Sequence, residues 1–302
     1  MITFASKYID KHMQILVDSG STKTTWSIML PAVNGFQFHT EGINPVRDNV
    51  ETIRDVVAKA YSAIDAEFLC GHASSLVGSN SFEQVHFYGA GCTPAFSPIV
   101  ADVLRAFFPS AVIKVDSDML GAARALCQHE AGIACILGTG ANSCLYDGAN
   151  IVKQVSPLGW ILGDEGSGAV LGRTLLSDVL KGQLPEHIIE AFQERYHLDA
   201  AAAIENVYRS PQPNRWLASF VPFIAEHREE ESLQLLLSSQ FRAFFRRNLK
   251  SYNCEGLPVH FVGSIAWYFK SELLAAAVAE GFSIGRVLRN PIEGLEKYHR
   301  SK

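Results

Sequence analysis

The stretch ILVDSGSTKTTW, residues 15–26, places an aspartate and a run of glycine, serine and threonine directly after three aliphatic residues. The aliphatic residues predict a strand and the polar run predicts a tight turn. The next residues, TTWSIML, again have the composition of a strand, so the segment is predicted to be a β-hairpin. It is not a Walker A loop, because that loop has the spacing G-x-x-x-x-G-K-[ST] and leads into a helix.

A second segment of the same design follows at residues 133–148, IACILGTGANSCLYDG. The elements after each hairpin also correspond in order, with a third strand, then an apolar strand ending in glycine, then a last strand. They are GFQFHTEG and NIVKQVSPLG, then VHFYGAG and VHFVGSI, then AVIKVDSD and FSIGRVLRNP. Strands alternating with helical patterns are typical of an α/β fold, and this repeated order predicts a duplicated α/β domain.

The duplication predicts two lobes. We expect the first to contain residues 13–117 and 287–302, and the second to contain residues 118–286 with a helical insertion at about 168–250. Residues 1–12 are expected to lie outside the fold. Two such lobes leave a cleft into which both hairpin turns can point, and ligand sites favour crevices of this kind.

The composition narrows the classes of function. The chain has 302 residues with a net charge of −5, from 26 basic and 31 acidic residues, so no nucleic-acid partner is expected. Its six cysteines include no CxxC pair and no zinc-type spacing, which suits reduced thiols in the cytoplasm. No signal peptide or membrane-spanning run is recognisable, so we expect a cytoplasmic protein with no membrane partner.

Several acidic residues stand where chemistry is feasible, and each also has a plain structural explanation. Asp18 either accepts backbone N–H groups of its own turn or holds magnesium beside a phosphate. In VDSDMLGAARALCQ, a strand ends and a helix begins, so Asp118 is either a helix cap or a general base. In GWILGDEGSGAVLGR, the carboxylates of Asp164 and Glu165 either interact favourably with the positive end of the following helix or contact a ligand. His86 and His260 lie in apolar strands and are expected to be structural.

Taken together, the motifs VDSGSTKTTW, VDSDMLGAARA, LGTGANS, GWILGDEGSGAVLG and VGSIAW resemble the BadF/BadG-type ATPases of the sugar kinase and actin-like superfamily, and within it the N-acetylglucosamine kinases. The resemblance covers nearly the whole chain from Met13 onward. It implies an α/β fold of two ribonuclease-H-like lobes with ATP in the cleft. Similar kinases are dimers, so a homodimer is an expectation of the resemblance.

The resemblance also implies roles for individual residues. The first phosphate loop and its Mg²⁺, held by Asp18 through water, would involve Asp18, Gly20, Ser21, Thr22 and Thr24. The second phosphate loop would be Gly138, Thr139 and Gly140, with Gly263 and Ser264 beside the adenosine. Asp118, followed by Gly121 as in the family's D-x-x-G segment, would be the base, and Asn44, Asn142 and Asp164 would hold the sugar. Ser19 departs from the glycine that many members of the family carry.

The implied reaction is direct in-line transfer of the γ-phosphoryl group of ATP to the 6-hydroxyl of an amino sugar, N-acetylglucosamine first among them. An aspartate near its reference pKa of about 3.9 would already be ionised at neutral pH and able to act as the base. Glucosamine, N-acetylmannosamine and muramic acid derivatives stay open as acceptors. Two other classes stay open as well: an ATP-driven activator of a radical dehydratase or reductase, and a non-catalytic sensor of sugar or nucleotide in which Asp118 is only a cap.

Overall fold

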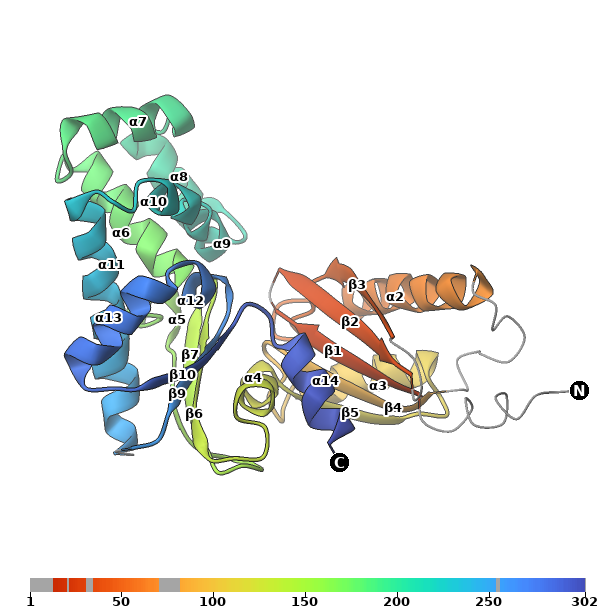
Figure 1. Ribbon diagram of the computed structural model, residues 1–302. Helices are drawn as coiled ribbons and strands as arrows, with labels where there is room; N and C mark the ends of the chain where they lie inside the picture. Colours follow the sequence, from red (N-terminus) through yellow and green to blue (C-terminus); the bar gives the residue numbers. More distant parts are fainter. Residues whose placement is uncertain (1–12, 21, 31–34, 71–81, 254–255, 302) are drawn as a thin grey trace, which may run out of the picture. The chain divides into compact units, whose positions relative to one another are not determined.

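A computed structural model describes residues 13–20, 22–30, 35–253 except 71–81, and 256–301 (Figure 1). Residues 1–12, which the sequence places outside the fold, are not among those described. The chain divides into two compact units, one running to Gln128 and including the C-terminal segment from Pro291, and the other spanning His129–Asn290. The first boundary lies after helix α4 (Asp118–Cys127), whereas the sequence placed it before that helix.

The first unit is built on a five-stranded sheet of order β3-β2-β1-β4-β5. Strands β1, β2 and β3 form an antiparallel meander, while β4 and β5 run parallel to β1. The bounds are β1 (Met13–Ser19), β2 (Lys23–Met29), β3 (Phe36–Glu41), β4 (Phe82–Gly89) and β5 (Val112–Ser117).

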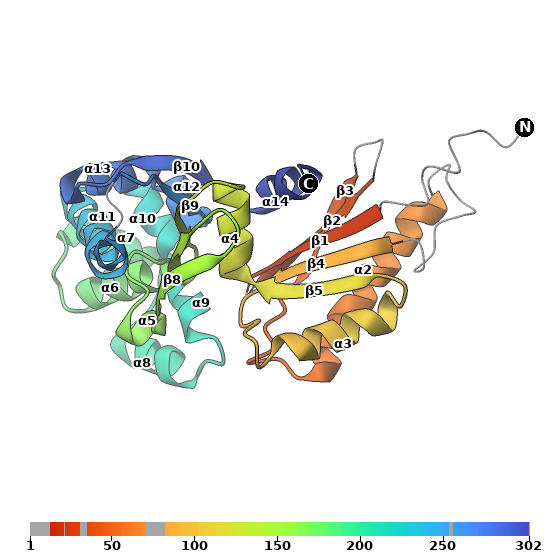
Figure 2. The same cartoon turned by 90° about the horizontal axis from the view of Figure 1, so that it is seen from below.

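Helices cover both faces of this sheet, as Figure 2 shows. Because side chains alternate along a strand, Ile15 and Val17 of β1 pack in the core with α2 (Val50–Cys70) and α3 (Ser97–Phe107). Leu16 faces the other way, in a cluster with residues of α4 and of α14 (Ile292–Arg300). Helix α4 therefore belongs to the first unit through its packing, which a local sequence pattern does not reveal.

The second unit repeats the topology with a sheet of order β10-β9-β6-β7-β8. Its meander is β6 (Gly132–Leu137), β7 (Ala141–Tyr146) and β8 (Ile151–Val155), and the parallel strands are β9 (Val259–Val262) and β10 (Ile284–Leu288). Helices α12 (Ser264–Tyr268) and α13 (Lys270–Glu280) join β9 to β10. The matching strand orders confirm the α/β class and the two ribonuclease-H-like lobes.

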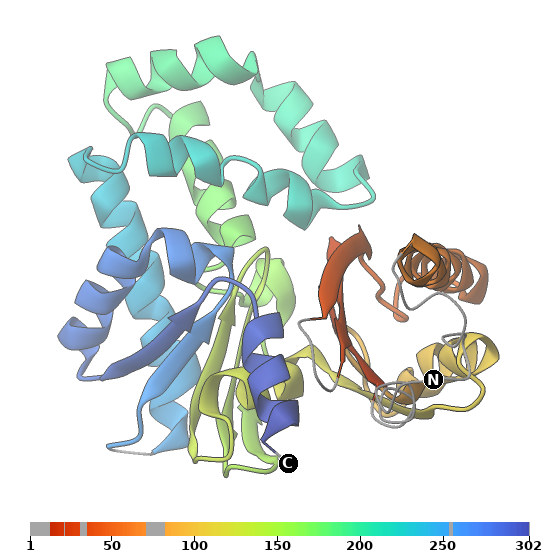
Figure 3. The same ribbon diagram turned by 45° about the vertical axis from the view of Figure 1, so that its right-hand side comes forward.

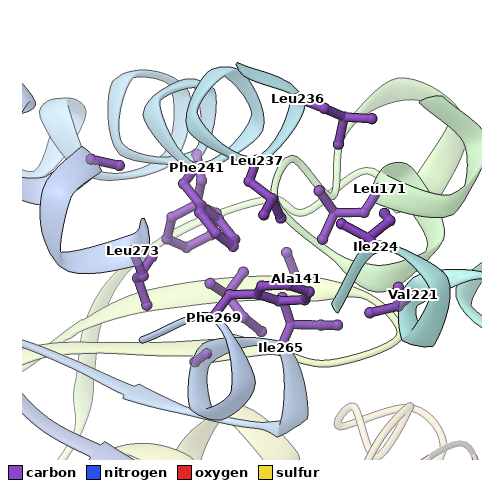
Figure 4. Close-up of a cluster of buried hydrophobic side chains, with 14 of the residues drawn as sticks. Ala141, Leu171, Val221, Ile224, Leu236, Leu237, Phe241, Ile265, Phe269 and Leu273 are labelled. Atoms are coloured by element: carbon purple, nitrogen blue, oxygen red, sulfur yellow. The ribbon is translucent and has the colours of Figure 1, made fainter. Parts of the chain in front are cut away.

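In the sequence of this unit, a set of helices lies between β8 and β9 (Figure 3). They are α5 (Gly159–Leu162), α6 (Gly168–Leu180), α7 (Glu186–Tyr196), α8 (Ala200–Arg209), α9 (Pro213–Ala218), α10 (Val221–Glu226), α11 (Glu231–Phe244), the π-helix η2 (Phe245–Leu249) and the short helix η3 (Lys250–Tyr252). Their apolar faces share one core with α12 and α13, and Figure 4 shows Leu171, Ile224 and Phe241 of this core beside Ile265 and Phe269. The insertion is thus an integral part of the unit.

Several buried groups are structural, as expected. The described cysteines Cys92, Cys127, Cys135 and Cys144 are buried, and none of these four forms a disulfide. The His86 ring lies against the His299 ring, with centroids 4.0 Å apart and planes tilted by 40°. His260 Nδ1 accepts a hydrogen bond from the Arg286 N–H. No helix in the described part of the chain has the length and apolarity needed to cross a membrane.

Candidate active site

The first candidate set of residues lies at one edge of the first sheet. In the parallel ladder, Ser19 at the end of β1 is level with Gly89 of β4, and Gly89 is level with Ser117 of β5. Asp18 and Asp118 therefore come from strand ends at the same edge. Burial and the negative charge of Asp118 raise the pKa of Asp18 to about 7, with Lys23 acting in the opposite direction.

Ser117 caps helix α4, which bears on the choice between cap and base for Asp118. The Leu120 N–H donates to Ser117 Oγ at 3.2 Å, so Ser117 is the N-cap residue. Asp118 is the first residue of the helix, and its Oδ1 accepts the Met119 N–H at 2.8 Å. Burial raises its pKa above the reference value that the sequence suggested. The helix has its cap without Asp118, and this carboxylate stays beside Asp18.

The hairpin turn between β1 and β2 is closed by a hydrogen bond from the Gly20 N–H to the Lys23 carbonyl at 3.0 Å. Thr22 is exposed, as a phosphate contact requires, and Ser21 lies outside the described residues. Thr24 has no exposed surface, and its hydroxyl is hydrogen-bonded to Ser19 Oγ at 2.7 Å. The prediction that Thr24 contacts phosphate is therefore corrected for its side chain. The buried Thr24 hydroxyl instead joins the two strands that flank the turn through its hydrogen bond to Ser19.

Asn44 occupies a loop between β3 and α2. Its Oδ1 accepts the Val46 N–H at 3.1 Å, and its own N–H donates to Asp48 Oδ2 at 2.8 Å. The side chain lies against Gly91, where a Cβ atom would come within 2.2 Å of Asn44 Oδ1. The residue is thus a turn asparagine, as its position before proline suggested, and it is held next to the end of β4.

The second candidate set surrounds the β6–β7 turn of the second unit. The Gly138 N–H donates to the Gly140 carbonyl at 3.0 Å, which closes the turn. The first N–H groups of α6, those of Gly168 and Ala169, donate to the carbonyls of Gly138 and Thr139 at 2.8 and 3.0 Å. The turn therefore rests on the positive end of a helix, a setting that favours an anion. A Cβ atom on Gly138 would meet nothing within 4 Å.

Asp164 packs beside this turn. It has a φ of +54°, is 8% exposed, and its carboxylate accepts the Ala141 N–H. A Cβ atom on Gly140 would lie 3.1 Å from Asp164 Oδ2. Burial raises the pKa of Asp164 to about 6, and the charge of Glu165 adds to this, although the Ala141 N–H opposes it.

Glu165 and Asn142, which the sequence also singles out, make contacts of their own. Glu165 pairs with Arg247 at 2.6 Å and accepts from Asn248 Nδ2 at 3.1 Å, so it anchors its loop to the π-helix. Asn142 Oδ1 accepts from the Ser143 N–H at 2.9 Å and from Gln154 Nε2 at 3.0 Å. Both side chains therefore stabilise the surroundings of Asp164 and the β6–β7 turn.

A pocket of about 520 Å³ opens beside the same turn. It brings together three residues that the sequence predicted for nucleotide, Gly138, Thr139 and Ser264. The remaining lining comes from the start of α6, from α9, α10 and α12, and from the junction of α12 with α13. It is mostly apolar: Gly168, Ala218, Val221, Pro222, Ala225, Glu226, Ile265, Tyr268 and Phe269. Sequence reasoning missed the α9 and α10 residues, because an apolar helix carries no local sign that it lines a pocket.

Gly263 has a backbone role at this site. Its φ is +125°, and a Cβ atom there would lie 2.2 Å from the Leu137 carbonyl oxygen. The glycine thus lets the end of β9 pass close to the end of β6. It places the neighbouring Ser264 at the pocket.

We expect Gly263→Ala to lower the free energy of unfolding by about 3 kcal/mol or more, because strain and a backbone clash coincide. Thermal unfolding would report this as a fall in Tm of roughly 8 °C. Gly182→Ala is the matched control, since Gly182 also has a positive φ, +65°, but its Cβ would meet nothing within 4 Å. Equal shifts for the two variants would show that the close approach to Leu137 does not matter.

Comparison with known proteins places this fold in one class. No family model matches the chain, and no curated protein matches it by sequence. Two solved structures bear the name putative N-acetylglucosamine kinase. The one from Porphyromonas gingivalis is 45% identical, with 96% of this chain and 99% of that chain covered and a TM-score of 0.89. The one from Chromobacterium violaceum is 16% identical, with 95% and 98% covered and a TM-score of 0.68, and shares the fold.

The two-lobed α/β architecture is that of the sugar kinase and actin-like superfamily. The extent and identity of the first match confirm the resemblance drawn from the motifs. The chain belongs to the N-acetylglucosamine kinase family of BadF/BadG-type ATPases.

Proposed function

We propose that the protein is an ATP-dependent kinase that transfers the γ-phosphoryl group to the 6-hydroxyl of N-acetylglucosamine or a close amino sugar. The observation that carries the proposal is the coupling of Asp18 and Asp118 at one sheet edge, in a chain of this family. A phosphoryl-transfer site needs a carboxylate for the acceptor hydroxyl and a place for a cation, and this pair supplies both.

Asp118 is the proposed base. Its carboxylate takes the proton of the sugar hydroxyl while the sugar oxygen bonds to the γ-phosphorus and the bond from that phosphorus to the bridging oxygen breaks, which leaves ADP. Asp18 is the proposed holder of hydrated Mg²⁺, and it fits such an ion because burial and the negative charge of Asp118 make its own charge unfavourable, which a cation would relieve. When bound, Mg²⁺ would neutralise part of the negative charge of the phosphates.

In the second unit, the apolar pocket suits the base and ribose of ATP, and the turn of Gly138, Thr139 and Gly140 suits its phosphates. The turn has the positive end of α6 behind it, which supports an anion at this place. Ser264 lies on the pocket wall. In the first unit, the turn of Gly20 and Thr22 is the proposed second phosphate contact.

Gly138→Ala is expected to raise the KM for ATP about 10- to 100-fold while leaving Tm within about 2 °C. The added methyl meets no protein atom, so its effect falls on the phosphate that approaches the backbone. Steady-state kinetics and a thermal melt check the two halves. A normal KM for ATP would remove the β6–β7 turn from the phosphate site.

Asn44, Asn142 and Asp164 are the proposed sugar-binding residues. Asp164 supports this role because it is a nearly buried carboxylate beside the phosphate turn, where an ionised form could accept hydrogen bonds from sugar hydroxyls. The contacts of Asn44 and Asn142 use their Oδ1 atoms, so their Nδ2 groups are the proposed donors to the sugar. We further propose a cytoplasmic location, which the buried thiols without disulfides suit, and a homodimer.

The proposal is tested by ADP release with Mg²⁺ and ATP across glucose, glucosamine, N-acetylglucosamine, N-acetylmannosamine and a muramic acid derivative. We expect turnover to depend on sugar and to be fastest with N-acetylglucosamine. ADP release that ignores the sugar, together with bound iron in the isolated protein, would favour an activator of a radical enzyme. Binding of ATP or sugar with no turnover would favour a sensor.

A further inference from the structure

Ser19, the last residue of β1, lies beside the β1–β2 turn and makes an unusual set of contacts. It has no exposed surface. Its Oγ accepts the Ile43 N–H at 2.9 Å, lies 3.1 Å from the Ile43 carbonyl and 2.7 Å from Thr24 Oγ1. A hydroxyl has one proton and two lone pairs. Accepting from Ile43 and Thr24 and donating to the Ile43 carbonyl uses all three.

These contacts join three segments of the first unit. Thr24 belongs to β2, on the far side of the hairpin turn, and Ile43 belongs to the loop that carries Asn44. The loop has a second tie to the hairpin, from the Gly42 N–H to the Thr22 carbonyl at 3.2 Å. The Ser19 carbonyl also accepts the Ala90 N–H at 2.9 Å, at the exit of β4.

The β4 exit leads to Gly91, against which the Asn44 side chain lies. Asn44 is therefore held in place by two neighbours, which are the preceding residue Ile43 and the segment after β4. Ser19 contacts both of these segments, by its side chain and by its carbonyl.

We propose that Ser19 is a positioning residue that sets the position of Asn44 relative to the β1–β2 hairpin, whose first strand carries Asp18. This inference rests on the proposed function, in which Asn44 contacts the sugar. Without the hydroxyl, the N–H and carbonyl of Ile43, which is 1% exposed, lose their partner and the loop must shift to find others. The buried hydroxyl of Ser19 thus has a defined role in this chain.

The test compares Ser19→Ala with Ser27→Ala in steady-state kinetics. Ser27 is a matched control because it is also a buried sheet serine, 2% exposed, and its Oγ donates to Glu296 Oε1 at 2.5 Å, on the α14 side of the sheet. Both variants are expected to lower Tm by roughly 5 °C. Only Ser19→Ala should raise the KM for the sugar, about 10-fold, with the KM for ATP within about 2-fold.

Ser19→Cys is the second variant, since it keeps the shape of the side chain with a weaker donor and acceptor. It should fold even where alanine does not, and raise the sugar KM by a smaller factor. Hydrogen exchange adds an independent readout: the Ile43 amide should lose protection in the Ser19 variants and keep it in Ser27→Ala.

The outcomes separate the inference from the function on which it rests. A wild-type protein that phosphorylates the sugar, with a sugar KM that Ser19→Ala leaves unchanged or that Ser27→Ala raises equally, overturns the role of Ser19 alone. A wild-type protein that phosphorylates no sugar overturns the proposed function, and the role of Ser19 toward a sugar with it.

Discussion

Asp118→Asn is expected to lower kcat for sugar phosphorylation about 1,000-fold, because asparagine keeps the shape of the side chain and cannot take the proton of the acceptor hydroxyl. The variant should fold normally. Ser117, and not Asp118, caps α4, and an amide oxygen can still accept the Met119 N–H. The KM for ATP should stay within about 2-fold, since the proposed nucleotide pocket lies in the second unit.

Stopped or coupled assays with saturating ATP and sugar measure this loss. Asp102→Asn is the control, because Asp102 is an exposed carboxylate of the same unit that pairs with Arg105 at 2.6 Å. It should leave kcat unchanged. If Asp118→Asn kept more than about a tenth of wild-type kcat, the general-base role would be wrong and the helix-terminus role would be sufficient.

Asp18→Asn is expected to lower Mg²⁺-dependent turnover at least 100-fold and at the same time to stabilise the ligand-free protein. Loss of the carboxylate removes the proposed contact to hydrated Mg²⁺, which serves the phosphates throughout transfer. Stability should rise because Asp18 is partly buried beside Asp118, so its charge is unfavourable until a cation arrives. A residue kept only for folding would show the opposite stability change.

The pH dependence follows from the sign of the shift. The pKa of Asp18 is about 7 in the folded protein and 3.8 when unperturbed. The folded state therefore holds a proton that the unfolded state has released, and stability is lost as pH rises from about 4 to 7. Above pH 7 the ionised Asp18 remains unfavourable.

Thermal unfolding without Mg²⁺ should show Asp18→Asn above wild type by roughly 5 °C at pH 8, about 2 kcal/mol after allowance for partial exposure. The difference should shrink towards pH 4. Added Mg²⁺ should raise the Tm of wild type more than that of the variant. A variant that is less stable than wild type at pH 8 would contradict the electrostatic account of this edge.

The parts of the fold that depend on local patterns could be predicted from the sequence. Two hairpins in the same serial order, at residues 15–26 and 133–148, are enough to predict two α/β lobes, because strand periodicity and turn composition are local properties. The resemblance of the motifs to a known family implied nucleotide contacts for Gly138, Thr139 and Ser264, and these three residues do line one pocket.

What could not be predicted depends on packing between distant segments. Helix α4 was assigned to the second lobe, because nothing in its own sequence shows that it packs with α14. Thr24 was assigned to phosphate, because the local sequence does not show that its side chain is buried against Ser19. The pocket wall from Val221 to Glu226 comes from an insertion with no motif. Propensity and motif describe single segments, and these features arise where segments meet.

Phosphorylation of an amino sugar by this protein is tested most directly by identifying the product. Purified protein would be incubated with ATP, Mg²⁺ and N-acetylglucosamine, and the mixture analysed by phosphorus and carbon NMR. The account predicts stoichiometric ADP and a phosphate ester on the 6-oxygen of the sugar, absent with Asp118→Asn. ADP that appears with inorganic phosphate and unmodified sugar would contradict it.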